Sequence, residues 1–161
     1  MAQASEKTNR LIEVVIDEAV PARRSADAEH ERRVAIYDLI EENHFLPNGC
    51  GEGPFILRLS LIEGRLWFDI GDAQGQPVTK VALPLQPFRS LLRDYSLICE
   101  SYHQAIKNAP RSRIEAIDMG RRGIHNEGSE LLIEKLEGQI EIDLDTARRL
   151  FTLVFVMQMR G

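Results

Sequence analysis

The stretch FILRLSLIEGRLWFDI, residues 55–70, constrains the fold of this chain more than any other segment. Apolar and polar residues alternate along both of its halves, and the pair Glu63–Gly64 separates them. Side chains of a strand point alternately to opposite faces, and an X-Gly pair suits a tight turn with positive φ. The pattern therefore predicts a β-hairpin with one apolar face. VTKVAL (78–83) follows a longer turn and extends the hairpin to a three-stranded meander.

A strand and a helix are expected before the hairpin. RLIEVVID (10–17) is rich in β-branched residues and alternates weakly, which is typical of a strand. The segment 26–43 predicts a helix with Val34, Tyr37 and Ile40 on its apolar face, which Ile36 and Leu39 widen.

Helical patterns dominate after the meander. Residues 88–106 have apolar side chains at spacings of three and four, the clearest helical signal in the chain. SRIE (112–115) has the form of a capping box and predicts the start of a second helix, which runs into the glycine-rich stretch after it. The remaining segments predict a short helix over 129–138, a strand over 139–144 and a final helix over 145–159 with Asp145 as its cap.

The predicted order of elements is β-α-β-β-β-α-α-α-β-α. A length of 161 residues suits one domain, and no repeat or change of composition divides the chain. Hairpin-linked strands favour an antiparallel or mixed sheet over a doubly wound one. We therefore expect a single α+β domain over 10–161, with about five strands and about five helices, preceded by a flexible N-terminus over 1–9.

Charge and hydropathy exclude several classes of partner. The net charge of −5 disfavours nucleic acid and anionic membrane surfaces, so neither is expected as a partner. The apolar run 150–157 is too short to span a bilayer, and the first ten residues contain no apolar signal segment. These features predict a cytoplasmic protein. The predicted helix 145–159 is apolar on nearly all sides around residues 150–157, so it is expected in the core or in a homo-oligomer interface.

The segment MGRRGIHNEGSE (119–130) concentrates arginine, glycine and polar residues between two predicted helices. A structural interpretation explains much of it. Gly123 would follow the end of one helix, Asn126 would cap the next, and Arg121 and Arg122 would complement the negative helix end.

The same segment also fits a site for a small anion. A helix N-terminus presents free N–H groups, and Arg121 or Arg122 adds a bidentate fork. His125 is a switchable proton donor or base, and Glu127 can orient an arginine. The predicted ligand-binding residues are Arg121, Arg122, His125, Asn126 and Glu127. His125 is the candidate for catalysis, although the sequence leaves open whether the protein is an enzyme.

Other motifs carry less chemistry. The loop NGCGEGP (48–54) contains Cys50 but lacks the Lys-Ser/Thr ending of a nucleotide P-loop, so it is expected to be a connector. Cys50 and Cys99 are expected as free thiols. The four histidines are scattered, and no metal or cofactor is predicted.

Four long stretches resemble an uncharacterised family of alphaproteobacterial proteins. The resemblance covers nearly the whole chain after the first ten residues, and it implies a cytoplasmic bacterial protein without implying a reaction. The stretches are HERRVAIYDLIEEN (30–43), YSLICESYHQAI (95–106), IEAIDMGRRGIHNEGSELL (114–132) and IEIDLDTARRLFTLVFV (140–156).

Two hypotheses on function follow. The first is a binding site for a phosphate- or carboxylate-bearing ligand at the helix junction 119–130. The alternative is a non-enzymatic interaction or regulatory protein, acting as a homodimer or a partner-docking module. The apolar 145–159 helix and Trp67, on the polar face of the meander, favour the alternative.

Overall fold

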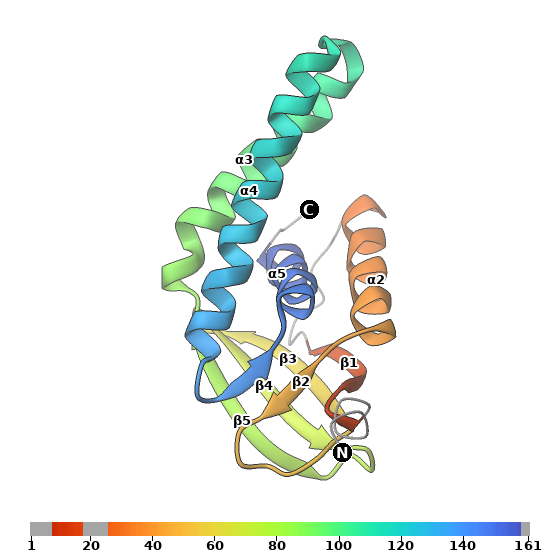
Figure 1. Cartoon of the computed structure of the whole chain (residues 1–161), viewed down its shortest axis with the longest axis vertical. Coiled ribbons are helices and arrows are strands. Elements are labelled where there is room, and N and C mark those ends of the chain that lie inside the picture. The colour runs from red at the N-terminus through yellow and green to blue at the C-terminus, as the bar shows by residue number, and fades with distance from the viewer. Residues whose placement is uncertain (1–7, 18–25, 159–161) are drawn as a thin grey trace.

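A computed structural model of the chain describes residues 8–17 and 26–158 (Figure 1). Its main sheet has the strand order β1-β3-β4-β5, in which β1 runs parallel to β3 and the other pairs are antiparallel. The fold is α+β with a mixed sheet, as the sequence predicts. The strands are β1 (Leu11–Asp17), β3 (Phe55–Ile62), β4 (Arg65–Asp72) and β5 (Pro77–Pro84).

The predicted hairpin is confirmed. A two-residue turn at Glu63 (φ 51°) and Gly64 (φ 76°) joins β3 to β4. Positive φ at both residues matches the right-handed twist of the flanking strands. The apolar face of the meander is buried, and on the opposite face the ammonium of Lys80 lies 5.5 Å from the ring centre of Trp67. The buried residues of the meander are Phe55, Leu57, Leu59, Leu66, Phe68, Ile70, Val81 and Leu83.

The helices lie on one side of the sheet, and a long helical hairpin extends away from it (Figure 1). That hairpin consists of α3 and α4, while α5 packs against both α2 and α4. None of the helices in the described part of the chain is long and apolar enough to cross a membrane. The helices are α2 (Ala26–Glu41), the short 3-10 helix η1 (Gln86–Phe88), α3 (Arg89–Asn108), α4 (Arg111–Leu136) and α5 (Leu144–Gln158).

The apolar character of α5 is explained by the core of a single chain. Its middle is buried against α2 and α4 in the same core as the buried residues of the sheet, and Phe151 is fully buried there. Homo-oligomerisation through residues 145–159 therefore stays a prediction. The buried residues of α5 are Thr146, Ala147, Leu150, Phe151, Leu153, Val154, Phe155 and Val156.

The number of elements differs from the prediction. The structure describes four α-helices rather than about five, because residues 111–136 form one helix. It also has a sixth strand, β2 (Phe45–Pro47), which lies between the predicted helix 26–43 and the predicted loop 48–54. This strand pairs antiparallel with β6 (Ile140–Ile142), about a hundred residues further along the chain, so local sequence carries no signal for it.

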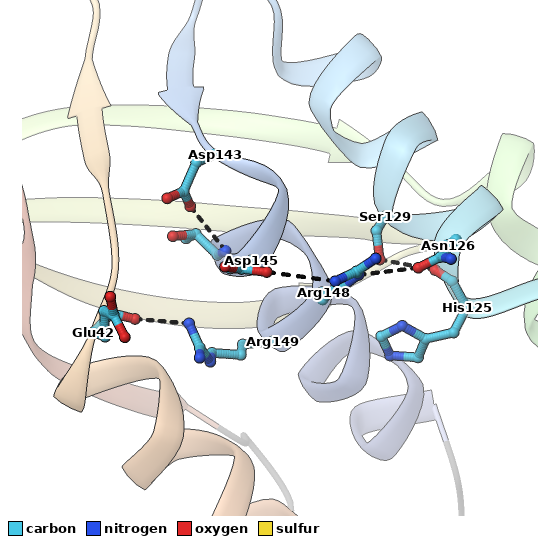
Figure 2. Close-up of polar contacts among 9 residues, drawn as sticks. Glu42, His125, Asn126, Ser129, Asp143, Asp145, Arg148 and Arg149 are labelled. Atoms are coloured by element: carbon cyan, nitrogen blue, oxygen red, sulfur yellow. Dashed lines mark hydrogen bonds and ion pairs between the residues drawn. The ribbon is translucent and has the colours of Figure 1, made fainter. Parts of the chain in front are cut away.

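Two predicted helix caps are wrong. Ser112 lies inside α4, whose N-cap residue is Pro110, and no side chain caps that end. At the start of α5, Asp143 takes the role predicted for Asp145. Its Oδ1 accepts a hydrogen bond of 2.9 Å from the backbone N–H of Thr146 (Figure 2).

The apolar face of α2 is also rotated from the prediction. Val34 and Tyr37 are exposed, whereas Leu39 is buried and Ile36 and Ile40 pack against the core, as predicted. Ala35, outside the predicted face, is also buried. Hydrogen bonds join the end of α2 to β1 in this orientation. The amide of Asn43 just after α2 accepts a hydrogen bond from the Leu11 N–H and donates to the Leu11 carbonyl. The flexible N-terminus predicted for 1–9 lies mostly outside the described residues.

Candidate functional site

The segment MGRRGIHNEGSE is the middle of a helix rather than a junction between two. α4 continues through Gly120, Gly123 and Gly128 without a break over its 26 residues. Gly123 is therefore not a helix stop, and Asn126 is not a cap. The predicted helix N-terminus that would bind an anion does not exist at this position.

Two of the glycines in α4 have packing roles. A Cβ built on Gly120 would lie 2.8 Å from Cδ1 of Ile98 in α3. A Cβ on Gly128 would overlap the ring of Phe151 in α5. Gly123 has no atom within 4 Å of such a Cβ. Close approach of neighbouring helices thus explains Gly120 and Gly128.

Asp118 holds both arginines of the segment. Arg121 and Arg122 stand three and four residues after it, where helical side chains are neighbours. Arg121 donates from Nη2 to Oδ1 of Asp118 over 2.6 Å. Arg122 donates from Nε to Oδ2 over 3.0 Å and also from Nη2. The guanidinium groups of Arg122 and Arg121 hold the pKa of Asp118 below its usual range.

The two arginines have different surroundings. The side chain of Arg122 is 76% exposed, whereas that of Arg121 is 30% exposed. The guanidinium carbon of Arg121 lies 4.2 Å from the ring centre of Tyr102 in α3. This distance is in the range of a cation–π contact, which orients the guanidinium in addition to its ion pair. Arg121 is therefore fixed and partly buried, and Arg122 is a surface residue.

His125 lies in the packed interface of α3, α4 and α5. Its Nε2 is 2.9 Å from the hydroxyl oxygen of Thr152, and its ring centre is 5.1 Å from that of Phe151 and 5.4 Å from that of Tyr95. Burial lowers the pKa of His125, and the charges of Arg148 and Arg121 lower it further. The imidazole is therefore neutral at neutral pH.

Asn126 and Glu127 face other parts of the molecule. Oδ1 of Asn126 accepts a 3.0 Å hydrogen bond from Nε of Arg148, whose Nη1 lies 3.4 Å from Asp145 (Figure 2). Glu127 is exposed. The five predicted ligand residues thus do not converge on one point.

A cavity of about 680 Å³ lies beside this region and is lined by residues of α2, α3, α4 and α5. We call it the helix cavity. Arg121 is the residue of the predicted site that lines it, and His125 is placed behind Thr152, which also lines it. The charged lining residues are Glu31, Asp38, Glu100, Lys107, Arg121 and Arg149, and other lining residues include Val34, Ala35, Tyr95, Cys99, His103, Thr152 and Phe155.

Sequence reasoning did not assign Tyr95, Cys99 or Arg149 to a site. Tyr95 and Cys99 belong to the apolar stripe of α3 and look like core residues in sequence, yet both line the helix cavity. Burial raises the pKa of the Tyr95 hydroxyl and of the Cys99 thiol. The available signal was that two residues one helical turn apart on the apolar stripe carry a polar hydrogen.

Both cysteines are free, as predicted, and Cys50 donates its S–H to the carbonyl of Asn48 over 3.5 Å. Within residues 8–17 and 26–158, no group of three or more His, Cys, Asp or Glu side chains is arranged to hold a metal ion.

Because His125 is neutral in the folded protein, we expect the free energy of unfolding to depend on pH. In the unfolded chain its pKa is about 6.5, whereas in the folded chain it is lower. The contribution of His125 to the free energy of unfolding is therefore fully present above about pH 6.5 and is lost as the pH falls towards the folded pKa. The reason is that His125 binds a proton in the unfolded chain at a pH at which it stays neutral in the folded chain. We expect His125→Gln to flatten this decline in urea unfolding curves between neutral and acidic pH.

The exposed His30 provides the matched control, since His30→Gln should leave the decline of the wild-type protein in place. Equal pH dependence of His125→Gln and the wild type would show that His125 does not carry the effect.

Comparison with known proteins identifies the relationship. The family model described as an uncharacterised protein family, UPF0262, matches residues 8–160. A UPF0262 protein of Rhodopseudomonas palustris (strain HaA2) is 52% identical over 99% of this chain and 98% of its own length. Another from Rhizobium leguminosarum bv. trifolii is 56% identical over 94% of this chain and 96% of its own length. No solved structure matches. As the resemblance of the four stretches indicates, the chain belongs to the uncharacterised UPF0262 family, whose similar members here come from alphaproteobacteria.

Proposed function

We propose that this protein binds a small anionic ligand in the helix cavity, with Arg121 as its charged contact. The supporting observation is the way in which Arg121 is held. Asp118 engages Nη2 and the ring of Tyr102 supports the guanidinium plane. An arginine carries five N–H donors, and the others of Arg121 have no acceptor among the described residues. Such a preorganised fork suits a carboxylate or phosphate group.

Neutral donors near Arg121 complement the guanidinium. The raised pKa values of Tyr95 and Cys99 keep both groups protonated at neutral pH, so each carries a hydrogen. Both residues line the helix cavity, and the charge of Arg121 acts on both. An anionic oxygen at Arg121 therefore has an O–H donor within the same cavity.

The other charges of the helix cavity limit the ligand. Lys107 and Arg149 add positive charge, but Glu31, Asp38 and Glu100 balance them. A second anionic group on the ligand would meet these carboxylates, so we expect a ligand with a single anionic group. Its remaining part would contact the apolar lining residues Val34, Ala35 and Phe155.

The proposal changes the roles of the other predicted residues. His125 acts on the helix cavity through its bond to Thr152, and its catalytic role stays a prediction. Asn126 positions Arg148. Arg122 is hydrogen-bonded to Asp118 at the surface, and Glu127 is exposed. Neither residue is included in the proposed contact with the ligand.

Arg121 and Arg122 form a matched pair for the test. We expect at least one of acetate, glycerol phosphate and inorganic phosphate to raise the melting temperature of the wild-type protein in a thermal-shift measurement. Arg121→Gln should weaken binding of that anion by about tenfold or more, since it removes a charge-assisted hydrogen bond. Arg122→Gln removes the same charge from the same ion pair and should retain binding.

Each variant is compared with its own melting temperature without anion, so a loss of stability does not count as a loss of binding. If none of the anions shifts the wild-type protein, or if both variants lose the shift equally, the proposal is wrong.

The alternative function, a homodimeric or partner-docking regulator, has one supporting observation. The α3–α4 hairpin extends beyond the rest of the fold (Figure 1), and Leu97, Ile106 and Met119 on it are 58%, 50% and 75% exposed. Single exposed apolar residues are ordinary on protein surfaces, so this function ranks second. The mass of the protein in solution, measured by light scattering, tests the homodimer directly.

A further inference from the structure

A second cavity, of about 870 Å³, lies at the opposite end of α4 from the α3–α4 turn. It is bounded by the last turns of α4, by the β2–β6 ribbon and by the loop that follows β2. We call it the acidic groove. Five glutamates line it, and its described lining contains no lysine, arginine or histidine. The glutamates are Glu52, Glu130, Glu134, Glu137 and Glu141.

Three of these glutamates lie at the C-terminal end of α4, where a negative side-chain charge is unfavourable. Glu130, Glu134 and Glu137 lie in or just after the last two turns of α4, which ends at Leu136. The C-terminal end of a helix carries partial negative charge and favours cations. Glu130 and Glu134 are also like charges four residues apart, which destabilises a helix. A cation in the acidic groove would offset both costs.

Asn9 supplies an independent sign of a missing partner. Asn9 lines the acidic groove and is only 7% exposed. Its backbone carbonyl accepts a hydrogen bond from the Phe45 N–H, which places Asn9 beside β2. Its side-chain Oδ1 is buried and has no hydrogen-bond partner. A buried acceptor without a donor is costly, so a ligand that brings an N–H group to this side of the groove would be favoured.

The rest of the lining is apolar and indicates the shape of the cation. Leu46, Pro47, Ile133, Ile140 and Ile142 also line the acidic groove. A compact metal ion makes no use of such side chains, and no three His, Cys, Asp or Glu residues in the described ranges are placed to bind one. Methylene groups pack against apolar surface, while ammonium groups pair with carboxylates.

We propose that the acidic groove binds an aliphatic polyamine, a chain of methylene groups with ammonium groups along it. The ammonium groups pair with Glu130, Glu134 and Glu137, one N–H group reaches the Oδ1 of Asn9, and the methylene groups cover the apolar lining. This proposal concerns a different cavity from the anion site, so the two succeed or fail separately.

Isothermal titration calorimetry with spermidine tests the proposal, at a fixed salt concentration of physiological strength. We expect saturable binding to the wild-type protein. The double variant Glu134→Gln/Glu137→Gln should bind spermidine about tenfold or more weakly, because it removes two charge-assisted pairs. Asn9→Ala keeps the net charge and should also weaken binding.

Matched controls separate the groove from general attraction to an acidic protein. Glu115→Gln/Glu63→Gln removes the same charge from two exposed sites outside the groove and should bind like the wild type. n-Butylamine, with one ammonium group, and Mg²⁺ should bind far more weakly than spermidine. Absence of spermidine binding, equal losses in the two double variants, or equal binding of Mg²⁺ would each overturn the proposal.

Discussion

Replacement of Gly128 by alanine is expected to destabilise the protein by about 3 kcal/mol, although alanine is the better helix former. The added Cβ would lie 2.7 Å from Cδ1 of Phe151 and closer still to Cε1 and Cζ. The ring cannot move aside easily, because Phe151 is fully buried and packs against the rings of His125 and Tyr95. Urea unfolding monitored by circular dichroism measures the effect.

Gly123 in the same helix provides the control. A Cβ there meets no atom within 4 Å, and its backbone is helical. Gly123→Ala should therefore stabilise the protein by about 1 kcal/mol, the difference between the two residues in a helix interior. Similar effects of the two substitutions would show that α4 and α5 do not approach each other at Gly128.

Phe151→Ala is expected to cost about 4 kcal/mol, the loss typical of a large buried aromatic side chain. Phe151 is at the centre of the core and is 0% exposed. The substitution removes the ring that Gly128 accommodates and opens a void beside His125 and Tyr95. The same urea unfolding experiment measures it.

The two substitutions should be coupled. In the Phe151→Ala protein there is space for the methyl group, so Gly128→Ala should cost less there than in the wild type by about 1–3 kcal/mol. Additive effects of Gly128→Ala and Phe151→Ala would contradict the direct contact between residue 128 and the ring.

The meander was predictable because its information is local. Alternation along 55–70 and the Glu63–Gly64 turn both depend on neighbouring residues, and the structure confirms them. β2 was not predictable in the same way. It is three residues long, includes Pro47, and exists through pairing with β6.

The glycines of α4 show why the predicted helix break is wrong. In sequence, a glycine after two arginines indicates a helix end. In the structure, Gly123 lies inside α4, and no atom lies within 4 Å of a Cβ built on it. Gly120 and Gly128 are required instead by the close approach of Ile98 in α3 and Phe151 in α5. Such a contact leaves no pattern in the residues next to the glycine.

The candidate site was predictable in part for the same reason. The sequence indicated arginines as anion ligands, but it could not distinguish Arg121 from Arg122. Adjacent residues of a helix point in directions about 100° apart, so only one of them can meet Tyr102 of α3 and the helix cavity. The far lining residue Arg149 comes from α5, and its place depends on the packing of that helix.

The rate of alkylation of the two cysteines tests the anion site most directly. Cys99 lines the helix cavity, whereas Cys50 lies in the loop after β2, and both thiols are free and partly exposed. The modification of each is followed by mass spectrometry, with and without the anion that gives the largest thermal shift. We expect the anion to slow modification of Cys99 in the wild type and in Arg122→Gln, but not in Arg121→Gln, while Cys50 is unaffected throughout. An unchanged rate at Cys99 under saturating anion, or equal slowing at Cys50, would contradict binding in the helix cavity.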